Sequence, residues 1–199
     1  ISKRLISSNS SLDDDIKYIL EIIGQYTDAD HCYLYFLSDN NELLINKNFY
    51  IKNKDGDKSK FLSKINVHNF TWLYSVISYS QGIIVKSLDD FPPEAEKEKA
   101  FFSTYNIQSL CIVPFVIENE VKGFLGLDYF NCVSFHGEEL PLLNTISELL
   151  SIVFKKNAIE IQLISNENFL DTLLNSIHIG IIIVDPATHS VLDVNAYGL

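Results

Sequence analysis

The residues best suited to metal or redox chemistry are three cysteines, Cys32, Cys111 and Cys132, and the histidines near two of them. His31 precedes Cys32, and Cys132 and His136 are four residues apart, which is half of a zinc-binding pair. A zinc site normally needs four nitrogen, sulfur or oxygen ligands with paired spacing. An odd number of cysteines in strand-like surroundings instead indicates small buried side chains in a reducing compartment, with no metal site.

Sequence signatures of catalysis are missing as well. The chain has no Gly-x-Ser-x-Gly motif for a serine nucleophile and no Gly-x-Gly-x-x-Gly loop for phosphates, and its five histidines are scattered. Cys111 and Cys132 fall in apolar stretches that are expected to be strands, where burial raises the pKa of a thiol and lowers its reactivity. We therefore predict that the chain has no catalytic residue.

The charge balance limits what the protein can bind. Its 199 residues include 26 Asp and Glu against 15 Lys and Arg, which gives a net charge of −11, and the sequence pI is about 4.8. Nucleic acids and anionic membranes attract an excess of basic residues, so neither is an expected partner. No apolar run reaches the roughly 20 residues of a membrane-spanning helix, and the first residues do not resemble a signal peptide. The sequence therefore predicts a cytoplasmic protein, and 47% hydrophobic residues supply a full core.

The elements that must position any site alternate between helices and strand pairs. After a tail at residues 1–9, Ser11 is a candidate N-cap for an amphipathic helix that ends near Gly24. The pattern then predicts strands at 32–37 and 42–51, a polar surface loop at 52–60, a short helix at 69–79 and a short strand at 83–85.

The next helix is expected to begin at about Pro93, because proline is tolerated only in the first turn of a helix. Ala95, Phe102 and Tyr105 share one face of it, and Asn106 suits the left-handed conformation that ends many helices. Strands at 110–117 and 121–130 should then pair antiparallel. The prediction is an α+β fold in which helices flank a central antiparallel β-sheet.

A long helix is predicted at about residues 137–165, because apolar residues recur on one face well beyond the length that one small sheet can cover. The face consists of Leu140, Leu143, Leu150, Phe154, Asn157, Ile161 and Ile164. This spacing favours a homodimer in which two long helices pair, with Asn157 setting the register. The alternative is one helix that lies on the sheet of a monomer.

Between Trp72 and residue 128 the chain resembles a GAF domain of the subtype found in bacterial and archaeal sensor proteins. The resemblance is carried by Trp72, GIIV at 82–85, LDDFPPEA at 88–95, Glu98-Lys99 with Phe102, IQSLCIVPF at 107–115 and GFLGLD at 123–128. The expected GAF sensory domain spans about residues 10–160. Asn106 stands where the family often has glycine, and asparagine meets the same backbone requirement.

Residues 166–199 resemble the truncated N-terminal segment of a PAS domain. The stretch ENFLDTLLNSIHIGIIIVD at 167–185 would supply its first helix and strand, and VLDVN at 191–195 its second strand. A complete PAS domain needs about 100 residues, so most of it is absent, and how the segment packs is left open.

The GAF resemblance implies a small-molecule pocket between the sheet and the helices that cross its face. The residues of this chain expected to line it are Trp72, Phe91, Phe102 and Tyr105. The alternative is that these rings simply fill the core. If Phe102 belongs to the core, Phe102→Ala should cost about 3–5 kcal/mol.

The known ligand classes of the family fit this sequence poorly. Asn46-Lys47 lies in the wrong strand for the cyclic-nucleotide signature, and none of the three cysteines is followed by the histidine of a bilin attachment site. His68 is the one candidate for a haem ligand, and it is expected in a loop. The cofactor is therefore left as unknown.

The two resemblances together imply a non-catalytic sensory and regulatory domain of a cytoplasmic signal-transduction protein. A GAF domain followed by a PAS domain is most similar to a sensor histidine kinase of a two-component system, whose catalytic domain would lie beyond residue 199. A sensor module of a cyclic-dinucleotide signalling enzyme is the alternative. An alternative of another class is a GAF-type free methionine sulfoxide reductase, which needs reactive cysteines in loops.

Overall fold

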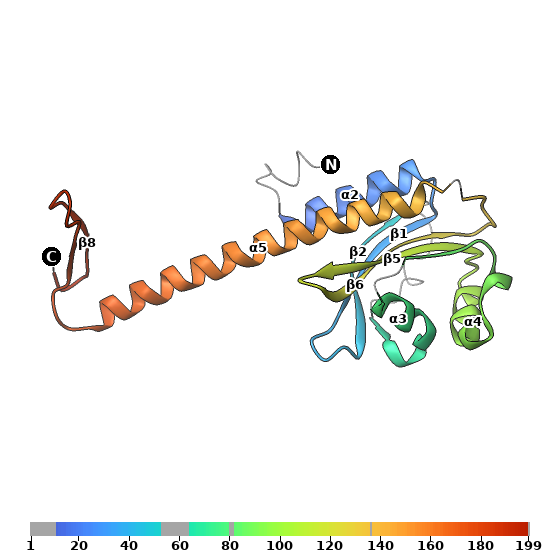
Figure 1. The fold of residues 1–199 in the computed structure, drawn as a ribbon, viewed down its shortest axis with the longest axis horizontal. Coiled ribbons are helices and arrows are strands. Elements are labelled where there is room, and N and C mark those ends of the chain that lie inside the picture. Colours follow the sequence, from blue (N-terminus) through green and yellow to red (C-terminus); the bar gives the residue numbers. More distant parts are fainter. Residues whose placement is uncertain (1–10, 53–63, 80–81, 136, 199) are drawn as a thin grey trace. The chain divides into compact units, whose positions relative to one another are not determined.

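The computed structural model describes residues 11–52, 64–79, 82–135 and 137–198. The chain divides into two compact units, Ile1–Val153 and Phe154–Leu199 (Figure 1). The predicted tail at 1–9, most of the predicted loop at 52–60 and His136 lie outside the described residues.

The first unit is built on an antiparallel β-sheet, as the sequence predicts. Its strand order is β3-β2-β1-β6-β5-β4, and every neighbouring pair is antiparallel. The strands are β1 (His31–Leu37), β2 (Leu43–Ile51), β3 (Lys64–Asn66), β4 (Ile83–Val85), β5 (Ser109–Ile117) and β6 (Glu120–Tyr129). The strands β1 and β6 therefore lie side by side at the centre of the sheet.

Helices cover both faces of this sheet (Figure 1). One face carries α2 (Leu12–Tyr26) and the first turns of α5 (Glu139–Ser176), and the other carries α3 (Thr71–Ser78) and α4 (Glu96–Thr104). Short 3-10 turns connect them: η2 (Val67–Asn69), η3 (Leu88–Asp90) and η4 (Pro93–Ala95). The α+β architecture predicted from the sequence is confirmed.

Local sequence explains where these helices begin and end. The Ser11 side chain accepts a hydrogen bond from the backbone N–H of Asp14, as expected of an N-cap. Asn106 has a φ of 57°, which confirms the left-handed conformation predicted after α4. The helix predicted from Pro93 instead starts as the turn η4, and α4 follows at Glu96. Similarly, the turn η2 occupies the first residue of the helix predicted at 69–79, so α3 begins two residues later than predicted.

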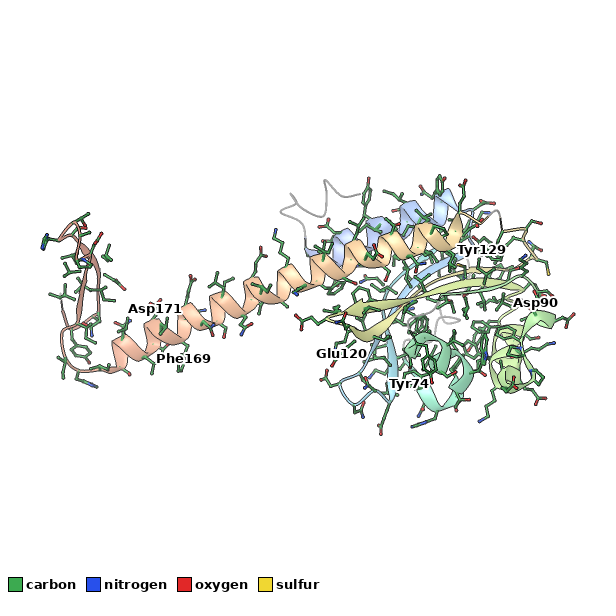
Figure 2. All side chains as sticks on the ribbon, in the orientation of Figure 1. Tyr74, Asp90, Glu120, Tyr129, Phe169 and Asp171 are labelled. Carbon is green, nitrogen blue, oxygen red and sulfur yellow. The ribbon has the colours of Figure 1, made fainter. Side chains whose placement is uncertain are left out.

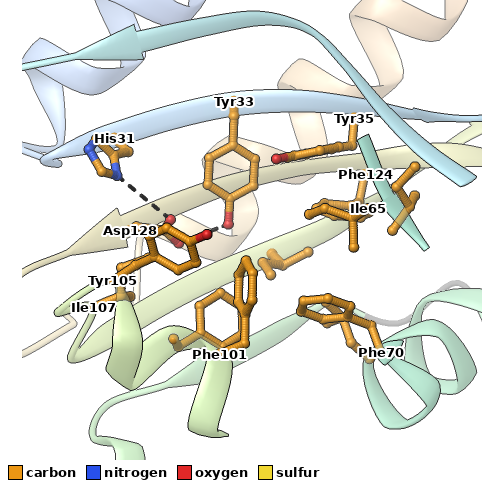
Figure 3. Close-up of a pocket in the computed structure, with 14 residues that line it drawn as sticks. His31, Tyr33, Tyr35, Ile65, Phe70, Phe101, Tyr105, Ile107, Phe124 and Asp128 are labelled. Carbon is orange, nitrogen blue, oxygen red and sulfur yellow. Dashed lines mark hydrogen bonds and ion pairs between the residues drawn. The ribbon is translucent and has the colours of Figure 1, made fainter. Parts of the chain in front are cut away.

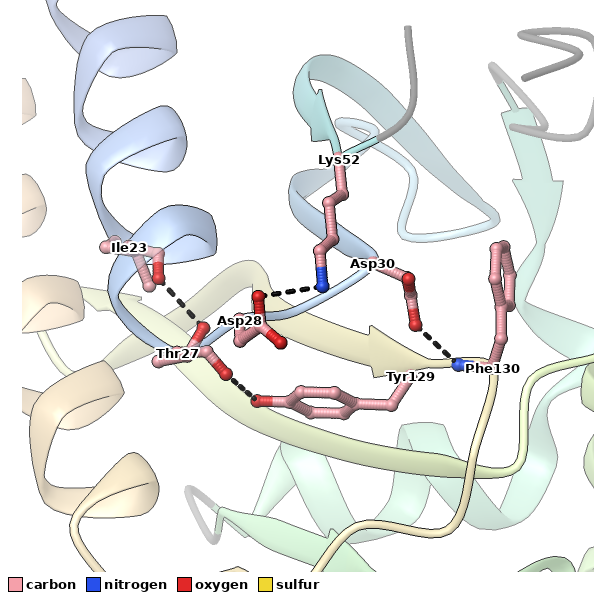
Figure 4. Close-up of polar contacts among 7 residues, drawn as sticks. All are labelled: Ile23, Thr27, Asp28, Asp30, Lys52, Tyr129 and Phe130. Atoms are coloured by element: carbon pink, nitrogen blue, oxygen red, sulfur yellow. Dashed lines mark hydrogen bonds and ion pairs between the residues drawn. The ribbon is translucent and has the colours of Figure 1, made fainter. Parts of the chain in front are cut away.

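The corner between α2 and β1 fixes the ends of the two central strands (Figure 4). The Asp30 backbone N–H donates to the carbonyl of Asp128 over 3.0 Å, and the Asp30 carboxylate accepts from the N–H of Phe130 over 2.8 Å. Lys52 pairs with Asp28 over 2.7 Å at the same corner. Asp30 therefore hydrogen-bonds to the backbone just before and just after Tyr129, the last residue of β6.

The long helix differs from its prediction in length. It was expected at about 137–165, but α5 runs from Glu139 to Ser176 and includes the residues expected to form a separate first helix of the PAS segment. No glycine or proline follows Pro141 within it, so nothing in the sequence ends the helix earlier. In the first unit Leu143, Ile146 and Leu150 are buried, and the Ser147 hydroxyl donates to the carbonyl of Pro114 over 2.6 Å.

The second unit contains the rest of α5 and an antiparallel hairpin of β7 (Ile182–Val184) and β8 (Val191–Val194), which confirms the two predicted strands. Asn195 is its buried polar residue: its side chain accepts from the N–H of Ile181 and donates to the carbonyls of Leu174 and Ile179, all within 2.9 Å. Most of its apolar side chains are exposed, including Phe169 at 62% (Figure 2). Among the described helices, none is both long enough and apolar enough to cross a membrane.

Candidate functional site

A pocket lies between the sheet and helices α3 and α4 (Figure 3). Its open volume is about 40 Å³, on a scale where one water needs roughly 10–15 Å³, so it has room for roughly three waters. His31, Tyr105 and Asp128 lie at one end, and Ile65 and Phe70 lie at the other (Figure 3). The pocket therefore has one polar end and one apolar end.

A buried carboxylate is the centre of the polar end. Asp128 is only 2% exposed, and its Oδ1 accepts a 2.8 Å hydrogen bond from the Tyr33 hydroxyl. His31 Nδ1 lies 3.9 Å from Oδ2 of Asp128. Burial raises the pKa of Asp128, while His31 and Tyr33 act in the opposite direction and the charge of Asp30 adds to the rise. Burial also raises the pKa of Tyr33 well above its usual value.

The alternation of strand side chains brings these groups together. In β1, His31, Tyr33 and Tyr35 point into the pocket, while the residues between them point to the face covered by α2. In β6, Phe124 and Asp128 line the pocket in the same way. This set of pocket residues was not predicted from the sequence. The signal was present, because every second residue of an otherwise apolar strand carries a polar aromatic ring.

Gly126 makes room for the Tyr33 ring. The two residues are directly opposite each other across β1 and β6, and a Cβ at Gly126 would overlap the ring and lie 2.7 Å from the Tyr33 hydroxyl oxygen. A side chain at this position would therefore move the ring away from Asp128.

We expect Gly126→Ala to cost about 1–3 kcal/mol, because it overpacks a filled site. Urea unfolding followed by Trp72, the only tryptophan, measures this loss in the first unit. The cost should largely disappear in a Tyr33→Ala background, where no ring remains to be displaced. An equal cost in both backgrounds would mean that the glycine serves the strand backbone and not the ring.

Aromatic rings on α4 and its flanks form the wall opposite the sheet. The Phe101 ring lies 4.7 Å from those of Phe70 and Tyr105 and 5.4 Å from that of Phe102. Phe102 is buried, whereas Phe101 and Tyr105 are partly exposed. On the sheet side, the Tyr35 ring stacks on Phe124 at 5.1 Å.

The four residues predicted to line a ligand pocket lie in one cluster but differ in position. Phe102 and Tyr105 line the pocket. Phe91 stacks behind Phe102 at 5.8 Å, and Trp72 packs edge-on against Phe91 at 5.5 Å, so neither ring reaches the pocket surface. That any of the four contacts a ligand stays a prediction.

A buried glutamate connects the two helices of this wall. Glu98 of α4 is 0% exposed, and its Oε1 accepts from the backbone N–H groups of Trp72 and Leu73 over 2.8 and 3.1 Å. It thereby caps the N-terminus of α3, where free N–H groups and the helix dipole favour a negative charge. The sequence prediction gave Glu98 no buried role, although its spacing from the buried Ala95 and Phe102 places it on the same helix face as these two residues.

The cysteines divide into two kinds. Cys32 and Cys111 are buried in strands, as predicted, and burial raises the pKa of Cys111 to about 12 and that of Cys32 further. Cys132 was predicted in a strand, and this was wrong: β6 ends at Tyr129, and Cys132 is exposed. Among the described residues, no group of three or more His, Cys, Asp or Glu could hold a metal ion. His68, which lies in η2, does not line the pocket.

Comparisons with solved structures identify the same fold in several sensor proteins. The phycocyanobilin-bound GAF domain from a cyanobacterial phytochrome matches with a TM-score of 0.70 and 14% identity, over 80% of this chain and 94% of that one. A domain of a putative two-component sensor histidine kinase from Sinorhizobium meliloti 1021 matches with a TM-score of 0.60 and 15% identity, over 78% and 98% of the two chains. Residues 122 to 287 of a methyl-accepting chemotaxis protein match with a TM-score of 0.63 and 11% identity, over 78% and 94%.

These identities are low enough that the likeness concerns the fold alone. The sequence matches none of the curated proteins with which it was compared. The family model of the GAF domain matches residues 11–154, which is more than half of the chain. The protein therefore belongs to the GAF domain family.

Proposed function

We propose that this chain is the sensory part of a cytoplasmic signalling protein, that it binds a small molecule in the pocket beside Asp128, and that α5 carries the response. GAF domains are sensory and regulatory domains, and the structural relatives come from a phytochrome, a putative histidine kinase and a chemotaxis protein. The single observation that supports binding is the pocket itself. A core that was merely filled would not leave open space next to a buried carboxylate.

The test is native mass spectrometry of the purified protein before and after denaturing release of small molecules. We expect a copurifying species that is lost on denaturation, or a ligand from a metabolite screen that raises the melting temperature. A bare mass together with no stabilising compound would contradict ligand sensing.

The path from the pocket to α5 would run through β5. Ile112 of this strand lines the pocket, and the carbonyl of Pro114, two residues further on, accepts the hydrogen bond from Ser147 of α5. A ligand that shifts β5 therefore acts directly on the helix that leaves the domain. Ser147→Ala should leave ligand affinity unchanged while weakening any effect of the ligand on the output.

The output we propose is a sensor histidine kinase of a two-component system, in which two copies of α5 pair and residues 166–199 begin a PAS domain. In the second unit Ile161 and Ile164 of the predicted face are exposed, and so are Ile159, Leu163, Leu170 and Leu173 of the same helix. Leu163, Leu170 and Leu173 recur at intervals of seven and three residues, which is compatible with the heptad spacing of a two-helix seam. A cyclic-dinucleotide signalling enzyme as the output is the alternative.

Sedimentation equilibrium tests the dimer. We expect a dimer at micromolar concentration, and Leu170→Asp should shift the protein to monomer because it places a charge in the seam. Thr172→Asp, on an exposed position of the same helix, is the matched control and should leave the dimer intact. A monomer at high micromolar concentration would exclude pairing through α5.

The alternative of a methionine sulfoxide reductase is weakened by the cysteines. That chemistry needs two thiols that can meet as a disulfide, and Cys32 and Cys111 are both buried with raised pKa values. We expect one thiol, Cys132, to react with a thiol reagent in the native protein and all three to react in denaturant. Fast reaction of two thiols in the native state would restore the reductase as a candidate.

A further inference from the structure

The ligand's charge can be inferred from the groups that face the pocket. Asp128 brings a carboxylate into it, and none of the lining residues is a lysine or arginine. His31 is the only lining side chain that can become positive, and it forms a long ion pair with the carboxylate, with Nδ1 3.9 Å from Oδ2. Apart from this long ion pair with His31, the lining residues offer the carboxylate no positive group, so a positively charged ligand would add to its neutralisation in a buried site.

The walls of the pocket are suited to a cation as well. Seven aromatic side chains line it besides His31: Tyr33, Tyr35, Phe70, Phe101, Phe102, Tyr105 and Phe124. The face of such a ring attracts a positive charge within about 6 Å. Neighbouring rings here have centroids 4.7–5.5 Å apart and pack against each other, so they form a continuous aromatic wall that a cation in the open space would face. An anion in the same place would be repelled by both the carboxylate and the ring faces.

We propose that the pocket binds a compact alkylammonium ion, with its charged nitrogen beside Asp128 and its alkyl groups against the aromatic rings. This inference rests on the proposed function and names the ligand class of the same site. The open space corresponds to roughly three waters, or about 90 Å³ of liquid, which suits an ion of about five non-hydrogen atoms. A larger ammonium ion needs Phe101 or Tyr105, the two partly exposed rings of the wall, to move outward.

The experiment compares a cation with its neutral isostere by isothermal titration calorimetry on the whole chain. The probes are tetramethylammonium, choline, and the carbon analogue of choline in which a tert-butyl group replaces the trimethylammonium group. We expect choline or tetramethylammonium to bind at least about tenfold more tightly than the neutral analogue. Equal or tighter binding of the neutral analogue would overturn the cation assignment.

Two variants show whether the preference comes from Asp128. Asp128→Asn keeps the size of the side chain and its acceptor for Tyr33, so the protein should remain folded and lose the preference for the cation. Asp39→Asn, in an exposed turn outside the pocket, removes the same charge and should keep the preference. A cation preference that survives in Asp128→Asn would overturn the proposal.

The outcomes also separate this inference from the proposed function. If none of the three probes binds but native mass spectrometry shows a copurifying neutral or anionic molecule, the ammonium class is wrong and ligand sensing stands. If none of them binds and nothing copurifies or stabilises the protein, both proposals fail.

Discussion

Replacing Glu98 with alanine is expected to lower the free energy of unfolding of the first unit by about 3–5 kcal/mol. Glu98 accepts from the N–H groups of both Trp72 and Leu73, and each N–H would lose its partner at once. A buried donor without a partner costs about 1–3 kcal/mol, and the truncated side chain leaves a cavity as well. The loss of the unfavourable burial of the carboxylate offsets part of this sum.

Two further variants separate the causes. Glu98→Gln keeps one acceptor oxygen and loses the charge at the N-terminus of α3, so we expect it to cost about 1–2 kcal/mol. Glu96→Ala, an exposed position on the same helix, should change stability by no more than about 0.5 kcal/mol. Urea unfolding followed by the fluorescence of Trp72 measures all three, because this residue lies at the capped end of α3. A cost below about 1 kcal/mol for Glu98→Ala would mean that water replaces the carboxylate.

Glu98 also illustrates why the sequence predicts the fold better than the site. Helix and strand periodicity depends on apolar residues, and this signal placed β1, β2, β5 and β6 and the face of α4 that carries Phe102 and Tyr105. The periodicity of apolar residues predicts that a charged residue is exposed. Glu98 is buried because it binds backbone N–H groups from another part of the chain. Only the tertiary structure shows that the N-terminus of α3 lies next to Glu98.

The polar end of the pocket could not be predicted from the sequence for a related reason. Asp128 ends a strong strand pattern, where an acidic residue normally marks the approach of a turn. Its burial depends on His31 and Tyr33, which lie about 95 residues earlier and meet it only because β1 and β6 are neighbours in the sheet. Of the four aromatic residues chosen from the family resemblance, Phe102 and Tyr105 line the pocket, whereas Trp72 and Phe91 do not. Which of them reach open space depends on packing distances that no local pattern contains.

At the end of α5 the local sequence was sufficient to predict the observed helix, but the resemblance to a PAS segment was given more weight. The resemblance of residues 167–185 to a PAS segment suggested a new helix, although the sequence contains no residue that would end the preceding one. The continuous helix to Ser176 follows propensity alone. A continuous helix at this point suits the relay that we propose.

Phe102→Ala is the second change with a large expected effect, a loss of about 3–5 kcal/mol in the free energy of unfolding. The ring is 4% exposed, stacks on Phe91 at 5.8 Å and meets Phe101 edge-on at 5.4 Å. Its removal takes away the support of the wall opposite the sheet, because Phe91 and Trp72 pack behind it. Tyr79→Ala is the matched control, since that ring is 79% exposed, and it should cost no more than about 0.5 kcal/mol.

The Phe102→Ala variant also tests the pocket, because the lost ring is one of its walls. If the neighbouring side chains hold their positions, the pocket grows by about the size of a benzene ring, and saturating benzene should restore part of the lost stability. The same addition should change neither the parent protein nor Tyr79→Ala by a comparable amount. A loss of about 3–5 kcal/mol that benzene does not reduce would mean that Phe101 and Tyr105 move into the space left by the ring. A loss below about 1 kcal/mol would instead show that the ring lines open space already and that the fold does not depend on it.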